Sequence, residues 1–129
     1  MASFEAVLEA VDLDGWMEEN ADGTKTLTLE YGGEIKVGTG KELMLENVAS
    51  LTLRRPKGRE MDTLERGMGG KFMEAARNFA QSLVIEPKTL PSRFAGDLDA
   101  ADMMRLIAVA LTFLPRPSAS RDGGTPPGL

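Results

Sequence analysis

Four basic side chains occupy six consecutive positions of an otherwise acidic chain. They are Arg54, Arg55, Lys57 and Arg59, in the stretch LTLRRPKGRE. Clustered cations of this kind bind phosphate groups, so a nucleic-acid interface is one interpretation. The other is a solvated corner between a strand and a helix, in which the arginines pair with nearby acids. The net charge of −5 and the lack of neighbouring aromatic side chains favour the corner. A charge-complementary protein contact is the next alternative.

Three aspartates lie close together in the sequence, Asp97, Asp99 and Asp102, and carboxylates are the ligands that hard metal ions such as Ca²⁺ prefer. However, Asp99 and Asp102 also stand where the N-cap and the N3 acid of a following helix belong. The chain has no histidine and no cysteine, which removes the commonest general base and all thiolate chemistry. We therefore expect no enzymatic activity, no cofactor and no bound metal.

Length and charge indicate one soluble domain. The 129 residues are about the size of a single domain. Residues 1–50 carry 11 acidic and 3 basic side chains, whereas residues 51–96 carry 5 and 9. These segments could pair within one fold or between copies in a homo-oligomer. No basic leader is visible, and the apolar run 106–114 is shorter than the ~20 residues that span a bilayer. We expect an intracellular protein without a membrane partner.

The first half of the chain predicts a short helix and then an antiparallel sheet. Ser3 can cap a helix with apolar residues at helical spacing, namely Phe4, Val7, Leu8 and Val11. Residues 26–31 and 34–37 alternate apolar and polar side chains on either side of Gly32-Gly33, which is typical of a β-hairpin. A second turn at 38–41 and extended runs at 43–45 and 50–53 complete the pattern. We expect a helix or arm over 1–20 and a three- or four-stranded meander over 24–54.

From Gly58 the hydrophobic period changes from 2 to 3.6. Helices are expected over about 58–68, with Gly58 as N-cap, and over about 71–84. A last helix should run from the N-cap Asp99 to about Leu114, where Pro115 stops it. Residues 58–114 thus form the helical part of a single α+β domain, residues 1–114. Residues 115–129 have the composition of a disordered tail.

The last helix is apolar nearly all round. In MMRLIAVALTFL, residues 103–114, only Arg105 and Thr112 are polar. Such a helix is either the central core helix or one whose surface another chain covers. Methionines on the expected helices suit either core filling or an adaptable binding surface. The residues that we expect to contact a partner are Phe72, Phe79, Met103, Leu106, Ile107, Ala110, Leu111 and Leu114, with Arg54 and Arg55 orienting the contact.

Two short motifs, taken in order, resemble a known family. The first is Leu53-Arg54-Arg55-Pro56-Lys57-Gly58-Arg59-Glu60, at the end of an expected strand. The second is Leu98-Asp99-Ala100-Ala101-Asp102-Met103, which leads into the apolar helix that ends near Phe113. With the LPSRF loop between them, they are similar to the tail assembly chaperones of Mu-like and related contractile-tailed phages. The resemblance spans about residues 40–114.

The resemblance implies a non-enzymatic role. Chaperones of this family bind the long, helical tape measure protein in the host cytoplasm and keep it soluble until tail-tube subunits polymerise around it. They are absent from the mature virion. We therefore expect the tape measure protein as partner, the tail tube protein as a further partner, and no contact with nucleic acid or membrane. One alternative is a structural virion component, such as a tail tube, baseplate or head–tail connector subunit. Another is a nucleic-acid-binding regulator that uses the basic cluster.

Overall fold

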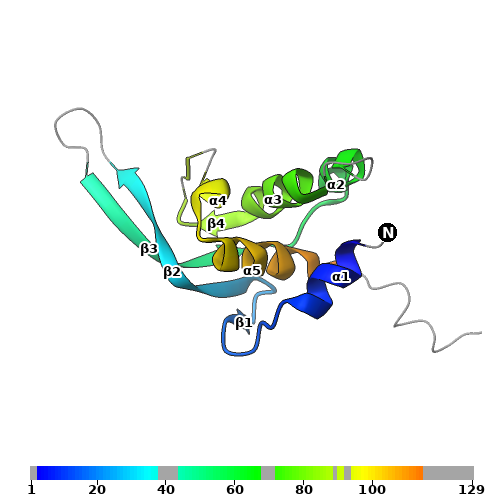
Figure 1. The fold of residues 1–129 in the computed structure, drawn as a ribbon, viewed down its shortest axis with the longest axis horizontal. Helices are drawn as coiled ribbons and strands as arrows, with labels where there is room; N and C mark the ends of the chain where they lie inside the picture. The colour runs from blue at the N-terminus through cyan, green and yellow to red at the C-terminus, as the bar shows by residue number, and fades with distance from the viewer. Residues whose placement is uncertain (1–2, 38–43, 68–71, 89, 92–93, 115–129) are drawn as a thin grey trace, which may run out of the picture.

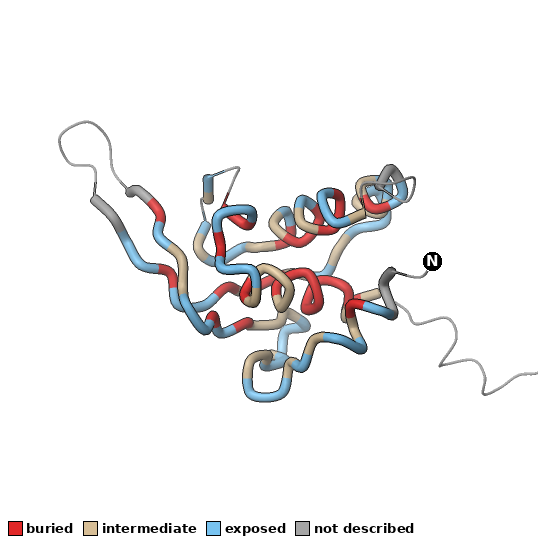
Figure 2. The backbone as a smooth tube through the Cα atoms, in the orientation of Figure 1, coloured by how far each residue is buried: buried red, intermediate tan, exposed pale blue. Residues whose placement is uncertain are grey.

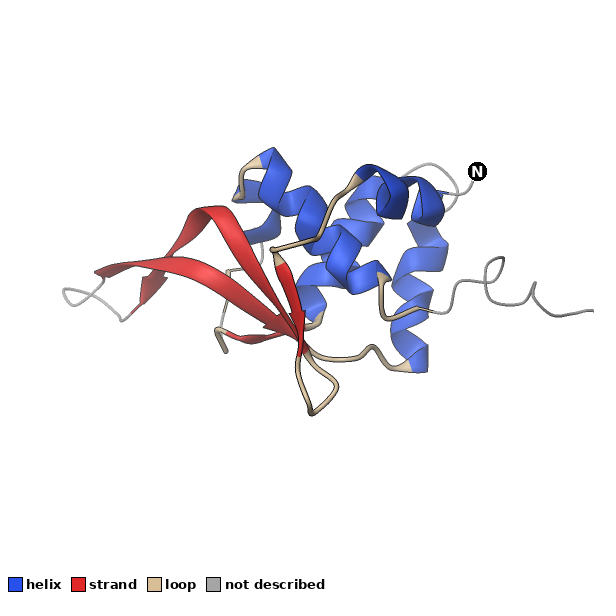
Figure 3. Cartoon of the chain, turned by 90° about the horizontal axis from the view of Figure 1, so that it is seen from below, coloured by secondary structure: helices blue, strands red, loops and turns tan. Residues whose placement is uncertain are grey.

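A four-stranded antiparallel sheet with helices packed against one of its faces makes up the described part of the protein (Figures 1 and 3). The computed structural model describes residues 3–37, 44–67, 72–88, 90–91 and 94–114. The strands follow one another in chain order across the sheet: β1 (Met17–Glu19), β2 (Lys25–Val37), β3 (Met44–Leu53) and β4 (Val84–Glu86). The expected α+β class with an antiparallel sheet is therefore confirmed, but only β2 and β3 lie within residues 24–54, where three or four strands were expected.

The helices lie together on one side of this sheet. In the described segments they are α1 (Ser3–Ala10), α2 (Met61–Gly67) after a short 3-10 turn η2 (Gly58–Glu60), α3 (Phe72–Ser82), α4 (Phe94–Asp97) and α5 (Ala100–Leu111). α5 lies at the centre of the molecule, where it contacts β2, α3, α1 and α4 (Figure 1). The helices expected to begin near residues 3, 58, 71 and 99 are confirmed.

The sheet contributes alternate side chains to the core beneath α5. Leu27 of β2 lies opposite Leu51 of β3, and both are fully buried. The neighbouring pair, Thr28 and Ser50, is exposed, because successive side chains of a strand point to opposite faces. The helices complete the core with buried apolar side chains, which include Leu64, Ala76, Phe79, Ala80 and Leu83 as well as residues 106–111.

Gly32-Gly33 is not the hairpin turn that the alternation predicted. β2 runs through both glycines as one strand, and its register with β3 shifts between Thr28, which pairs with Ser50, and Gly33, which pairs with Val48. Residues 29–32 therefore form a bulge opposite a single residue of β3. Gly32 has a φ of 77°, a left-handed conformation that suits a bulge as well as a turn. This ambiguity is the physical reason for the wrong prediction.

β2 and β3 extend well beyond their neighbours in the sheet. β1 pairs with β2 only at residues 25–27, and β4 pairs with β3 only at residues 52 and 53. Farther along, residues 33–37 pair with residues 44–48 alone. Figure 1 shows that this two-stranded segment, which we call the hairpin arm, projects from the body of the protein.

Smaller differences concern elements that the sequence patterns did not reveal. β1, β4 and α4 were expected to be loop or helix end, and each is only three or four residues long, too short for a periodic pattern. Residues 44–45 of the first expected run and the whole run 50–53 belong to one strand, β3. Gly58 is inside η2, whose N-cap is Lys57. The turn expected at 38–41, the last residue of the helix expected over 58–68, and Pro115 with the tail to residue 129 lie outside the described residues.

Candidate functional site

α5 is the central core helix. Residues 106–111 of this helix are at most 1% exposed, and Figure 2 shows that its C-terminal part is buried on all sides. Three elements cover it: β2 lies beneath, α3 runs alongside, and α1 lies at its C-terminal end (Figure 1). The uniformly apolar sequence is therefore explained by burial within this chain. The sequence allowed either a central core helix or a helix covered by another chain, and the structure shows the first.

This burial changes the list of residues that can meet a partner. Phe79, Leu106, Ile107, Ala110 and Leu111 were expected to contact one, but they are at most 1% exposed and belong to the core. They cannot touch another protein while the fold is intact. Phe72, Met103 and Leu114 are half-buried and pack against the rim of the core.

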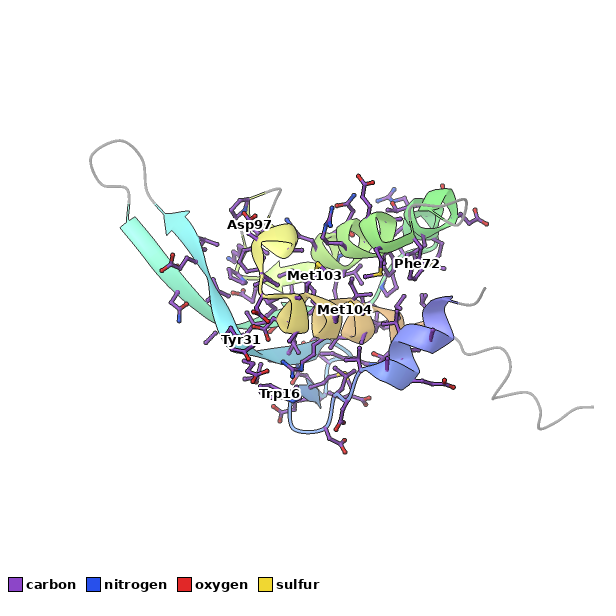
Figure 4. The ribbon with its side chains drawn as sticks, in the orientation of Figure 1. Trp16, Tyr31, Phe72, Asp97, Met103 and Met104 are labelled. Atoms are coloured by element: carbon purple, nitrogen blue, oxygen red, sulfur yellow. The ribbon has the colours of Figure 1, made fainter. Side chains whose placement is uncertain are left out.

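Half-buried apolar side chains come from several elements, and α3 and the first turns of α5 contribute three of them. We define the helical apolar face as Phe72, Met103 and Met104, which Figure 4 labels on α3 and α5. α3 and α5 pack on each other, so these residues belong to one continuous helical layer. Methionine side chains adapt to the shape of what they contact, and such a surface suits an apolar partner.

The basic cluster forms the structural corner that the sequence favoured. The Arg54 guanidinium donates two hydrogen bonds to the Glu60 carboxylate, at 2.9 and 2.5 Å. The backbone N–H of Lys57 donates to the same carboxylate at 2.6 Å, which holds the turn between β3 and η2. Arg55, Lys57 and Arg59 are exposed. Arg54 is therefore committed to Glu60, whereas Lys57 and Arg59 remain exposed at the corner.

The Arg54–Glu60 pair predicts a pH-dependent stability. The hydrogen bond from Arg54 lowers the pKa of Glu60 from 4.5 to about 2, and the Lys57 N–H contributes. Since the folded-state pKa lies below the unfolded-state value, the stabilisation is full above about pH 4.5 and is lost as the pH falls toward 2. Glu60→Gln should therefore cost about 1–3 kcal/mol of unfolding free energy at pH 6, after allowance for solvent screening at the partly exposed Arg54.

Urea unfolding of the wild type and of Glu60→Gln at pH 6 and pH 3 measures this effect. The gap between the two proteins should narrow at pH 3. The exposed Glu65, replaced with glutamine, is the control and should change stability little at either pH. A gap of equal size at both pH values would show that the pair does not titrate as described.

Asp102 connects α5 to the bulge of β2. Its side chain is fully buried, and its two carboxylate oxygens accept the backbone N–H groups of Glu30 and Tyr31 at 2.7 and 2.8 Å. A bulge removes such N–H groups from the strand ladder, and a buried donor without a partner is costly. Asp102 therefore satisfies the bulge, and does not serve as the N3 acid of a capping box. The predicted N-cap Asp99 is confirmed, since it accepts the N–H of Ala101 at 3.0 Å.

Arg105, the one charged residue within the apolar part of α5, completes this junction. Its guanidinium donates to Glu30 at 2.9 Å and to Asp102 at 3.3 Å. It also lies over the Trp16 ring, 4.1 Å from the ring centroid, in a cation–π contact. Arg105 thus links α5, β2 and the segment before β1.

A second cation–aromatic contact lies at the C-terminal end of α5. The Lys25 ammonium donates to the Thr112 hydroxyl at 2.8 Å and lies 4.6 Å from the centroid of the Phe113 ring. Arg55 lies over the same ring at 5.9 Å. Burial lowers the pKa of Lys25, while Glu19 opposes this change. A cation at a helix C-terminus is favoured by the helix dipole, so Lys25 stabilises the end of α5.

A pocket of about 430 Å³ lies between the bulge of β2 and α4. Its lining includes Tyr31 and Glu34 from β2, Asn47 from β3, and Phe94 and Asp97 from α4. None of these residues was expected to belong to a site. The sequence shows a tyrosine next to two glycines. This pattern indicates a site only when α4 is known to pack against β2.

Acidic side chains do not gather into a metal site in the described segments. No group of three or more aspartates and glutamates there could hold a metal ion. Two of the three aspartates considered above make other contacts. Asp102 accepts hydrogen bonds from β2, and Asp99 caps α5. Within the same segments, every helix is too short or too polar to cross a membrane.

Comparisons with models of known protein families, with curated protein sequences and with solved structures found no match to this chain.

Proposed function

We propose that this protein is a phage tail assembly chaperone, a non-enzymatic protein that binds the tape measure protein in the host cytoplasm and keeps it soluble. The observation that carries the proposal is the ordered pair of motifs at 53–60 and 98–103, which resembles that family. Both motifs have defined places in the fold. The first forms the Arg54–Glu60 corner, and the second begins α5 with its Asp99 cap and its Asp102 link to β2.

The helical apolar face is the surface best suited to the client. A tape measure protein is a long helix with apolar stripes, and an apolar stripe is removed from water when it packs on Phe72, Met103 and Met104. A chaperone that binds only the soluble form of its client stabilises that form by mass action. The stabilisation is about 2.7 kcal/mol when the chaperone is present at 100 times its Kd. Tube subunits that bind the same client more tightly then displace the chaperone.

Co-expression with a tape measure protein tests the proposal. The soluble fraction of the client should rise several-fold when this chain is present. A Met103→Ser/Met104→Ser double variant should lose most of that gain, because it removes apolar contact area from the face. Ile85→Ser, which changes an exposed apolar residue on β4, is the matched control and should keep it. If the client is equally soluble without this chain, the chaperone role is wrong.

The hairpin arm favours a second candidate, a structural virion component. Residues 33–37 and 44–48 pair only with each other, so both outer edges of the arm can receive a further strand from a neighbouring subunit. Subunits of a tube, baseplate or connector could join in this way. Mass spectrometry of purified particles separates the two candidates, since a chaperone should be missing from them and a structural subunit should be present in many copies.

A further inference from the structure

The pocket between β2 and α4 has an apolar floor and an acidic, aromatic rim. Phe94 and Leu98 are buried and form part of its lining. Tyr31, which is 63% exposed, lies at the β2 side, and Asp97 lies on α4, as Figure 4 shows. The exposed Glu34 and the side-chain amide of Asn47 complete the rim.

Gly32 in the bulge and Gly33, which follows it, keep this pocket open and in place. A Cβ atom on Gly33 would stand 3.0 Å from both Leu98 and Phe94, so only glycine lets α4 pack this closely on β2. A Cβ atom on Gly32 would stand 3.1 Å from the Asn47 side chain. The bulge is in turn held by Asp102 through the N–H groups of Glu30 and Tyr31. The shape of the pocket is thus set by rigid packing and buried hydrogen bonds.

The electrostatic surroundings of the pocket are negative. Among the residues that the structure describes, its ionisable lining consists of two carboxylic acids and a phenol. Glu30 and Asp99 lie close enough to raise the pKa of Tyr31. In the described segments, Glu34 and Asp97 make no ion pair, and two cations on neighbouring helices have other contacts. Arg105 is bonded to Glu30 and Asp102, and Arg77 packs beside Gly96 on α4.

We propose that this pocket binds an arginine or lysine side chain presented by a partner protein. The cation would lie against the face of Tyr31 and between the carboxylates of Glu34 and Asp97. Its aliphatic stem would pack on Phe94 and Leu98, as long basic side chains do on apolar surfaces. The rim is open and Tyr31 is largely exposed, so the side chain can enter while its own backbone stays outside. This proposal is independent of whether the partner is a tape measure protein.

Titration with short peptides, followed by amide chemical shifts of the labelled full-length chain, tests the proposal. The probe is a decapeptide with one arginine among alanine, serine and glycine, and its control replaces that arginine with citrulline, which has nearly the same shape and no charge. The arginine peptide should shift the resonances of Gly32, Gly33 and the Asn47 side-chain amide in a saturable way. Its affinity should exceed that of the citrulline peptide by about fivefold or more.

A Glu34→Gln/Asp97→Asn variant should weaken binding of the arginine peptide by a similar factor and leave the citrulline peptide unaffected. Both positions are exposed, so the fold should persist, which the unchanged remainder of the spectrum would verify. The matched control is Asp62→Asn/Glu74→Gln, two exposed acids on α2 and α3, and it should bind like the wild type.

Three results would overturn the proposal. The first is equal binding of the arginine and citrulline peptides, and the second is the absence of a saturable shift at the pocket up to millimolar peptide. The third is a shift of the pocket resonances with protein concentration alone, which would make a second copy of this chain the occupant. None of these results depends on the solubility of a tape measure protein, so the two proposals can fail separately.

Discussion

Replacing Asp102 with alanine should lower the free energy of unfolding by about 3–5 kcal/mol. The Asp102 carboxylate is fully buried and accepts the N–H groups of Glu30 and Tyr31 as well as a hydrogen bond from Arg105. Alanine leaves two backbone donors of the bulge without an acceptor and removes one of the two acids that neutralise Arg105. A fully buried donor without an acceptor costs about 1–3 kcal/mol, and these two part-buried donors belong at the lower end of that range.

Urea unfolding at neutral pH, followed by circular dichroism, measures the loss. Asp102→Asn should be intermediate, because an amide keeps one acceptor oxygen and loses the charge. Asp99→Ala, three residues away, removes only the N-cap hydrogen bond and should cost about 1 kcal/mol. If Asp102→Ala is no more damaging than Asp99→Ala, the carboxylate does not support the bulge, and the account of β2 given above is wrong.

The periodic parts of this fold could be predicted from the sequence. Alternation of apolar and polar residues located β2 and β3, and apolar residues at helical spacing located α3 and α5. The Asp99 cap was also predictable, because an N-cap bond is made within three residues of sequence. These features depend on local chemistry, and a single sequence contains all the information that they need.

Features that depend on distant contacts could not be predicted. Gly32-Gly33 permits a turn or a bulge, and the choice depends on Asp102, about seventy residues later, whose carboxylate accepts two N–H groups of the bulge. The pocket depends on α4, which is too short for a periodic pattern. The candidate site was missed for the same reason, since its residues converge only when α4 packs on β2.

The apolar helix shows why composition alone does not locate a binding surface. An all-round apolar sequence is expected both for a helix that another chain covers and for one at the centre of its own fold. The outcome depends on whether α1, α3 and β2 cover α5, which no property of α5 itself reveals. On α5 the half-buried apolar residues Met103 and Met104 lie in the first turns, and these are the residues of the helix that our proposed client contact uses.

Leu106→Ala tests this placement of α5. Leu106 is fully buried at the centre of the helix, so truncation removes apolar contact area and leaves a cavity. We expect a loss of about 2–5 kcal/mol in the free energy of unfolding. Met104→Ala removes a side chain of similar size two residues earlier in the same helix, and because Met104 is half-buried its cost should be clearly smaller.

Measuring client binding as well as stability in both variants distinguishes a core role of Leu106 from a surface role of Met104. In a buffer where both variants remain folded, Leu106→Ala should bind a tape measure fragment as the wild type does, because its side chain never reaches the surface. Met104→Ala should bind more weakly although it is the more stable of the two. The reverse pattern, a stable Leu106→Ala that no longer binds, would mean that α5 opens to meet its client and that the buried helix is itself the binding surface.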